Sequence, residues 1–109
     1  MARYIALFTG KPDAPRLTDP EIIARGMKAW SEWMATHAAH IVDTGGPLGR
    51  TRKVSAAGIT DVRNTIGGYV IVEASDHEAA ARMFEGHPQC TIFPGDGVEV
   101  MPCLPIPVA

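Results

Sequence analysis

Two segments of the chain are apolar at consecutive positions, and this feature restricts the possible folds more than any other. The first, Tyr4 to Phe8, lies within a predicted strand from Arg3 to Phe8. The second is rich in β-branched residues and lies within a predicted strand from Gly68 to Ala74. Because successive side chains of a strand point to opposite faces of its sheet, both faces of these strands need burial. The sequence therefore predicts a sheet that is covered on two sides.

A long amphipathic helix is predicted between the two strands. Thr18-Asp19-Pro20-Glu21 supplies capping side chains, a proline suited to the first turn and an acidic residue near the positive end of the dipole. Gly45-Gly46-Pro47 is expected to end the helix with a left-handed glycine, and Gly26 within it predicts a close packing contact. Apolar residues recur every three or four positions along one face: Ile23, Met27, Trp30, Met34, Ala38 and Ile41.

Shorter elements complete the pattern. Ser75 and Glu78 have the spacing of a capping box that opens a second helix, and Gly86-His87-Pro88 is expected to end that helix. The other predicted segments are, in chain order, a loop over 10–17, a strand from Arg52 to Ala57, a polar connection from Gly58 to Thr65, a turn over 94–97, a strand from Val98 to Met101 and an extended tail over 101–109.

The resulting order of elements is the ferredoxin-like β-α-β-β-α-β plan. We therefore predict an α+β fold, in which two helices cover one face of a four-stranded antiparallel sheet. A chain of 109 residues is expected to form one domain over 1–109. The second face of the sheet then lacks cover, and the sheet of a second copy is the simplest partner for it. The sequence thus predicts a homodimer that pairs through its sheet faces.

Composition excludes several classes of function. A net charge of −2 with both signs interspersed gives no electrostatic footprint for nucleic acid, and Arg50, Arg52 and Lys53 are expected to form a solvated strand face. No apolar stretch reaches the ~18 residues that span a bilayer. Cys90 and Cys103 fit neither a disulfide framework nor a zinc site, so we expect reduced thiols, no metal and no cofactor. Cytoplasmic localisation is the resulting expectation.

The candidate catalytic residues are His37, His40 and Asp43. The two histidines share a flank of the predicted helix, and Asp43 follows three positions after His40. A carboxylate beside a histidine orients the imidazole and stabilises its charged form, which is the usual arrangement of a general base. Alternatively, both histidines are solvated near the negative end of the helix dipole. An imidazole that points into a cavity, with a carboxylate within ~3 Å, would favour catalysis.

Five residues are candidates for ligand binding: Trp30, Trp33, Tyr69, Ser55 and His87. Each tryptophan can pack in the core, line a pocket or do both. Tyr69 follows two glycines, which permit the close approach of a ligand or of another backbone. Ser55 is a polar candidate for the pocket lining. His87 either leans over the open end of the sheet or ends the second helix facing water, and His77 is expected to face solvent.

Six segments carry a resemblance to a known family: Trp30 to Trp33, Asp43 to Gly49, Gly67 to Ser75, Glu78 to Ala80, His87-Pro88 and Val98 to Pro102. Together they resemble the YCII-related (DGPF-related) small proteins. The resemblance implies the dimeric α+β barrel fold and dimerisation, and it extends over roughly residues 3–103. A His–Asp pair is thought to act in this family, with the His near the start of the first helix. Here Ile22-Ile23-Ala24 stands at that place, and the Asp-Gly-Pro-Phe signature is absent.

Two functional interpretations follow. In the first, the homodimer holds a small organic molecule, aromatic or acidic, in a pocket between the long helix and the sheet, and His37 or His40 transfers a proton. The wider fold group to which the resemblance points includes dehydrochlorinases and muconolactone isomerases, which act on phenols and ring-derived acids. In the second, the pocket or the exposed face belongs to a non-catalytic binding or interaction module.

Overall fold

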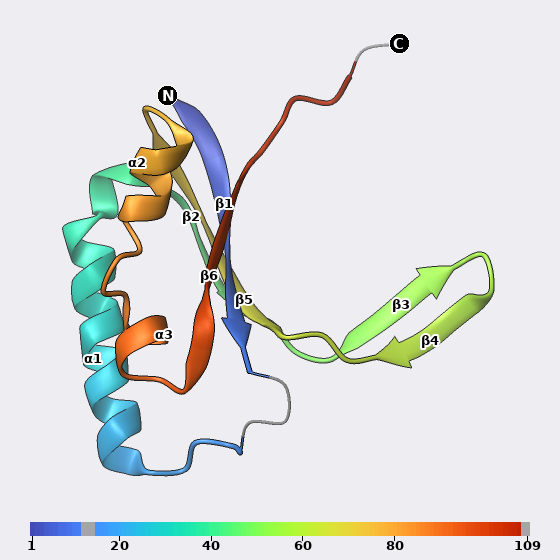
Figure 1. Ribbon diagram of the computed structural model, residues 1–109, viewed down its shortest axis with the longest axis horizontal. Coiled ribbons are helices and arrows are strands. Elements are labelled where there is room, and N and C mark those ends of the chain that lie inside the picture. Colours follow the sequence, from blue (N-terminus) through green and yellow to red (C-terminus); the bar gives the residue numbers. More distant parts are fainter. Residues whose placement is uncertain (12–14, 108–109) are drawn as a thin grey trace.

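A four-stranded antiparallel sheet forms the centre of the computed structural model, which describes residues 1–11 and 15–107 (Figure 1). The strand order is β2-β5-β1-β6, so the ferredoxin-like α+β prediction is confirmed. The two consecutively apolar segments occupy the two central strands of this order. The strands are β1 (Ala2–Gly10), β2 (Ile41–Pro47), β5 (Ile66–Ala74) and β6 (Gly95–Pro102).

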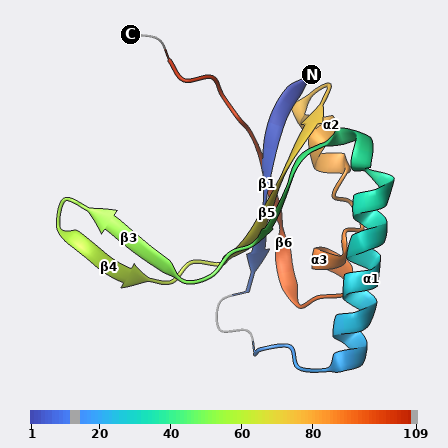
Figure 2. The same ribbon diagram turned by 180° about the vertical axis from the view of Figure 1, so that it is seen from behind.

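The helices all lie on one face of this sheet, as Figures 1 and 2 show from opposite sides. The long helix begins as predicted, because the Asp19 carboxylate accepts a hydrogen bond from the Glu21 N–H at 2.9 Å and Pro20 occupies the first turn. A third, short helix follows the two predicted ones. The helices are α1 (Pro20–Thr36), α2 (His77–Arg82) and α3 (Pro88–Thr91).

The core fills the space between the helices and the sheet. Alternate residues of the two central strands are buried there with three residues from the helical side, and each large apolar side chain stabilises the fold by about 1.5–3 kcal/mol. Gly26 of α1 is buried against the Phe93 ring, which a Cβ at this position would overlap. The glycine thus permits a close contact, but with a ring that follows α3 and not with a second helix. The buried apolar residues are Tyr4, Ala6, Phe8, Val70, Val72, Ala74, Trp33, Ala80 and Phe84.

The long helix ends earlier than predicted. It stops at Thr36, and a short 3₁₀ turn, η1 (Ala38–His40), leads into β2. Ile41, assigned from its spacing to the helix stripe, instead pairs with Val72 and packs on the core from β2. The spacing of apolar residues fits a helix at Ile41, but pairing with β5 and packing on the core place this residue in a strand. Gly45 has the predicted left-handed conformation, with φ +61, but within β2 and not at a helix end.

The predicted second strand of the sheet is wrong. The segment Arg52 to Ala57 falls largely in β3 (Thr51–Ser55), which pairs only with β4 (Gly58–Val62) in a separate two-stranded hairpin. The polar connection predicted from Gly58 to Thr65 therefore contains a strand. Polar and apolar residues alternate only weakly in both segments, so the sequence did not show which sheet these strands join.

Two smaller assignments also differ. Asp76, and not Ser75, caps α2: its carboxylate accepts a hydrogen bond from the Ala79 N–H at 2.7 Å. The helix ends at Arg82, before the predicted stop. Residues 12–14 of the predicted loop and 108–109 of the predicted tail lie outside the described residues, and the rest of the tail after Pro102 has no helix or strand.

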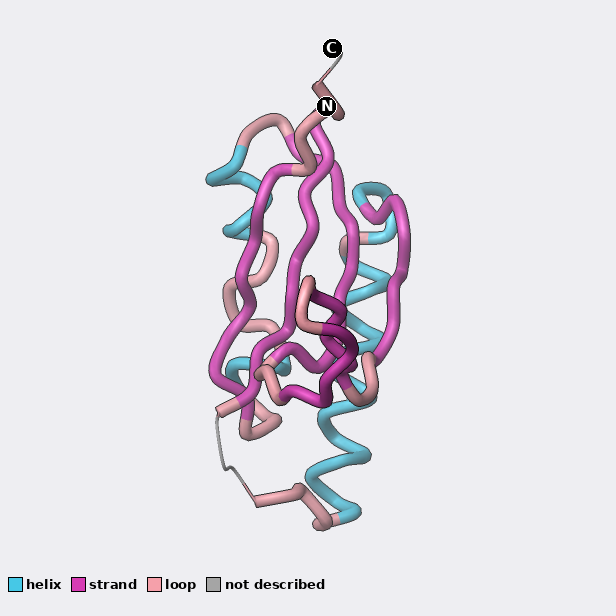
Figure 3. Tube along the Cα trace, turned by 90° about the vertical axis from the view of Figure 1, so that its right-hand side faces the viewer, coloured by secondary structure: helices cyan, strands magenta, loops and turns pink. Residues whose placement is uncertain are grey.

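The second face of the sheet carries no helix, as the view onto it in Figure 3 shows. Ile5 pairs with Ile71 and Leu7 with Tyr69 across the central strands. All four alternate with the buried core residues and are half-buried. Met101, opposite Ile5 on β6, extends the apolar surface. We call this surface the uncovered face.

Candidate functional site

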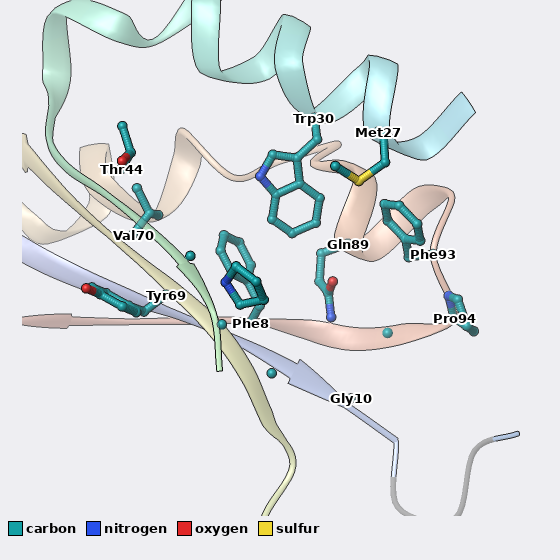
Figure 4. A pocket seen from close by; sticks show the side chains of 15 residues that line it. Phe8, Gly10, Met27, Trp30, Thr44, Tyr69, Val70, Gln89, Phe93 and Pro94 are labelled. Carbon is teal, nitrogen blue, oxygen red and sulfur yellow. The ribbon is translucent and has the colours of Figure 1, made fainter. Parts of the chain in front are cut away.

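A cavity of about 450 Å³ lies between α1 and the sheet. Figure 4 shows it bounded above by Trp30 and Met27 of α1 and on one side by Phe93 and Pro94 after α3. Phe8 of β1 lies at its base. The volume lies within the range of about 300–1,000 Å³ that is typical of small-molecule sites. The remaining lining residues are Gly10, Thr44, Gly46, Pro47, Gly67, Gly68, Tyr69, Val70, Gln89 and Gly95.

Glycines make part of the cavity wall flat. A Cβ on Gly68 would lie 3.1 Å from the Gly46 carbonyl oxygen and 3.3 Å from Cδ2 of Phe8. A side chain at Gly68 would therefore crowd Gly46 and Phe8, and the glycine eases the close approach of β2 and β5 here. Gly67 and Gly46 border the same cavity. Gly68 therefore permits the close approach of a neighbouring backbone and also lines the cavity, the two roles that the sequence analysis considered for Gly67 and Gly68.

Trp30 belongs to both the core and the cavity. Its indole lies edge-to-face on Phe8, with ring centroids 4.7 Å apart, and on Phe93 at 5.9 Å. Edge-to-face pairs of this kind hold aromatic rings in fixed orientations. Trp30 therefore presents a rigid aromatic surface to the cavity, in the position that the sequence analysis proposed for it.

The polar groups of the cavity are few and uncharged. Gln89 donates a hydrogen bond from Nε2 to the Thr9 carbonyl at 2.9 Å, which leaves its Oε1 without a hydrogen-bond partner among the described residues. Thr44, whose side chain carries a hydroxyl, is a second uncharged polar residue of the lining. No Asp, Glu, Lys, Arg or His is among the described residues that line the cavity. The site therefore offers hydrogen bonds and aromatic contacts but no ion pair.

His87 is fully buried, which corrects the interpretation that it faces water. It caps α3: its Nδ1 accepts a hydrogen bond from the Gln89 N–H at 3.0 Å. In the neutral ring the proton is therefore on Nε2, which has no hydrogen-bond partner among the described residues. Burial lowers the pKa of His87 to about 4, with a smaller contribution from His37. The imidazole is thus neutral at neutral pH.

Aromatic rings surround His87 on several sides. Phe8 stacks on the imidazole at 5.0 Å, and Trp30 and Trp33 meet it edge-to-face at 4.5 and 4.8 Å. His87 is not among the residues that line the cavity, but its ring contacts Trp30, which does. The residue therefore packs against the aromatic wall.

The remaining ligand-binding candidates lie in three different environments: Trp33 in the core, Tyr69 at the border of the cavity and Ser55 in the exposed hairpin. Trp33 is buried, donates a hydrogen bond from Nε1 to the Met83 carbonyl at 2.8 Å and stacks on Phe84. Tyr69 borders the cavity, but its ring lies on the side of β5 away from Trp30 (Figure 4). Ser55 is exposed in the β3–β4 hairpin. Of the five predicted ligand-binding residues, only Trp30 and Tyr69 border the cavity.

The predicted catalytic residues lie at the far end of α1 from Met27. His37 follows the last turn of α1, with its ring 4.7 Å from Trp33. Burial lowers the pKa of His37, and His40 lowers it further. The Asp43 carboxylate accepts a hydrogen bond from the Gly45 N–H at 2.8 Å. None of the three lines the cavity, and no histidine nitrogen in residues 1–11 and 15–107 lies within 4.0 Å of a carboxylate oxygen.

The fourth histidine, His77, is exposed, and its Nε2 lies 2.8 Å from the Val100 carbonyl oxygen. In the described part of the chain no three His, Cys, Asp or Glu side chains gather as metal ligands. No helix there is long and apolar enough to cross a membrane.

The comparison with solved structures finds a match to 5-chloro-2-hydroxyhydroquinone dehydrochlorinase (TftG) from Burkholderia phenoliruptrix AC1100, in complex with 2,5-dihydroxybenzoquinone. The TM-score is 0.55 at 17% sequence identity, over 91% of this chain and 90% of that chain. The two proteins share the fold. The chain matches no protein-family model and no curated protein, so membership of the YCII-related proteins stays a prediction.

Sequence reasoning missed several lining residues. Gln89 lies within α3 and Phe93 just after it, a segment for which no site was predicted. Met27 and Phe8 were assigned to the apolar helix face and to a buried strand. The one usable signal was Gly26, whose missing side chain indicated that another group packs there. That group is Phe93.

Proposed function

We propose that this chain binds a small, flat, uncharged aromatic molecule in the cavity between α1 and the sheet. The observation that carries the proposal is the lining, in which Trp30, Phe8 and Phe93 supply aromatic surface and no described side chain supplies a charge. A flat ring can pack against Trp30 and the glycines of β5, because both surfaces are flat. Burying a charged group without a partner costs several kcal/mol, so carboxylates are disfavoured.

Hydroxyl groups on the ring would give the ligand its orientation. The free Oε1 of Gln89 can accept a hydrogen bond from a phenol, and the Thr44 hydroxyl can donate or accept one. The bound 2,5-dihydroxybenzoquinone of the dehydrochlorinase with the same fold is also a flat, oxygen-substituted ring. This comparison supports phenols and quinones as the first compounds to test.

Catalysis is a separate question from binding. A proton-transfer role for His37 or His40 with Asp43 stays a prediction, since these residues lie outside the cavity lining. A neutral, buried His87 packed against Trp30 offers no accessible base. The geometry thus favours the binding module over the enzyme.

We also propose that the protein is a homodimer that pairs through the uncovered face, as the YCII-related resemblance implies. Ile5, Leu7, Tyr69 and Ile71 form a contiguous apolar surface there. Covering it would stabilise the pair by about 25 cal/mol for each Å² of apolar area buried. A monomeric mass by light scattering at micromolar concentration would contradict this proposal.

The binding proposal can be tested with the two tryptophans as separate reporters. Trp33→Phe leaves only Trp30, at the cavity, and Trp30→Phe leaves only Trp33, in the core. Hydroquinone and catechol are titrated against each variant, with benzoate as the charged control. We expect quenching of Trp30 by the phenols, a raised melting temperature, and little response from Trp33 or to benzoate.

Three outcomes would count against the proposal. Equal binding of benzoate would contradict an uncharged ligand. Equal quenching of both variants would place the ligand outside the cavity. No response to any ring compound would favour the interaction module. Circular dichroism of both variants checks that they are folded, because Trp33→Phe loses a hydrogen bond to Met83.

A further inference from the structure

The β3–β4 hairpin stands apart from the rest of the molecule. We call residues 49–64, which contain both strands, the arm. Figures 1 and 2 show it extending from the ends of β2 and β5 on the side of the sheet opposite to the helices, and Figure 3 shows it in front of the uncovered face. Among the described residues, β3 and β4 pair with each other and with no other strand. The arm and the uncovered face therefore border the same space.

An isolated two-stranded hairpin has marginal stability in water, because it has no third strand or helix to bury its side chains. Near its tip, Val54 and Ile59 form a cross-strand pair whose side chains are 75% and 61% exposed. Arg52 and Asp61 form the next same-face pair and an exposed ion pair of 3.5 Å. This face of the arm combines an apolar tip with charges behind it, which is the composition of a contact surface.

The charge of the arm is opposite to that of the remaining chain. Four of the ten Lys and Arg residues and one of the twelve Asp and Glu residues lie in the arm, namely Arg50, Arg52, Lys53, Arg63 and Asp61. The arm therefore carries +3, and the rest of the chain carries −5 out of the total of −2. A second copy of the same chain offers the complementary charge to each arm, which favours self-association over repulsion.

We propose that the arm clasps a second copy of this chain, and that the apolar pair at its tip packs on the flank of the partner subunit. The proposal rests on the homodimer proposed above. A partner that covers the uncovered face occupies the space beside the arm. Paired sheets lie about 10 Å apart, and five strand residues span about 17 Å, so the arm is long enough to pass the edge of the partner's sheet.

The first test measures dimer dissociation by analytical ultracentrifugation. The double variant Val54→Asp, Ile59→Asp places two charges on the tip of the arm. We expect its dimer Kd to rise at least ~10-fold, because apolar burial is lost and charges lose water. The matched control is Ile23→Asp, which changes a 37% exposed residue on α1, on the other side of the sheet. The control should dissociate like the unchanged protein.

The second test uses the unchanged sequence and so does not depend on how variants fold. Equal amounts of ¹⁴N- and ¹⁵N-labelled protein are mixed and treated with a carbodiimide, which joins Lys53 to nearby carboxylates. Peptide pairs of mixed isotope content from Lys53 would show that the arm reaches another copy. Lys53→Arg keeps the charge and should abolish these pairs.

The two proposals fail in different ways. A monomer at all concentrations would overturn the homodimer and the arm together. A stable dimer that Val54→Asp, Ile59→Asp leaves unchanged, with Lys53 joined only within its own copy, would overturn the arm and keep the sheet pairing. The proposal would also be overturned if Val54→Asp, Ile59→Asp left the dimer Kd unchanged but abolished binding to duplex DNA. The arm would then be assigned to nucleic-acid binding.

Discussion

The two faces of the central strands have similar compositions but different surroundings. On the helix side, Tyr4, Ala6 and Phe8 of β1 are at most 6% exposed. On the other side, Ile5 and Leu7 are half-buried and face no helix. The sequence pattern treats both faces as interior, whereas a single chain covers only one. Half of the apolar pattern is thus satisfied within the chain, and the proposed homodimer would satisfy the other half.

Neighbouring substitutions in β1 test this comparison with the largest expected effect. Phe8→Ala removes a ring packed against Trp30, Phe84 and His87. It should lower the free energy of unfolding by about 3–5 kcal/mol, whatever the protein concentration. The measurement is urea denaturation at two concentrations that differ a hundredfold.

Leu7→Ala is the matched change on the uncovered face. Its effect should depend on protein concentration, because in the proposed homodimer the lost contact lies between subunits. At low concentration it should cost under ~2 kcal/mol, the value for a partly exposed leucine. A concentration-independent loss as large as that of Phe8→Ala would show that Leu7 is buried within one chain.

His87 gives the helix side of the sheet a pH dependence. Its pKa is about 4 when folded and 6.5 when unfolded. Above pH 6.5 both states are neutral, so its contribution to stability is complete. As the pH falls the unfolded state takes up the proton first, and the contribution is lost down to about pH 4. Between pH 7 and 5 the loss should be about 2 kcal/mol.

The variant His87→Asn separates this titration from other acid effects. Asparagine can still cap α3 by accepting from the Gln89 N–H, but it does not titrate in this range. Its free energy of unfolding should therefore fall less between pH 7 and 5 than that of the unchanged protein, even if it is lower at both values. His77→Asn, at an exposed position, is the control. If the free energy of unfolding of His87→Asn changed with pH as much as that of the unchanged protein, folding would not lower the pKa of His87.

The features that were predictable from the sequence depend on local chemistry. The start of α1 follows from Asp19 and Pro20, and the central strands follow from consecutive apolar residues. The errors concern residues that satisfy two patterns at once. Ile41 continues the helical spacing and also fits an edge strand, and only its pairing with Val72 decides between them.

The candidate site was less predictable because its parts are distant in sequence. The cavity joins Phe8, Trp30, Gly68 and Phe93, which lie on four different segments. From the sequence, His87 was expected either to lean over the open end of the sheet or to face water at the end of the second helix, whereas it is buried. Its burial results from the rings of Phe8, Trp30, Trp33 and Phe84, of which only Phe84 is close to His87 in the sequence.

The smallest predicted effect concerns the cap of α2, part of the layer that covers the helix side. Asp76→Ala removes the acceptor for the Ala79 N–H and should cost about 1 kcal/mol. Ser75→Ala removes a neighbouring hydroxyl that makes no such bond in the described structure and should cost less than ~0.5 kcal/mol. Thermal unfolding of both variants, at one concentration and pH 7, checks the difference. If Ser75→Ala were the more costly change, the capping box predicted from the sequence would be the correct assignment, and the start of α2 would move by one residue.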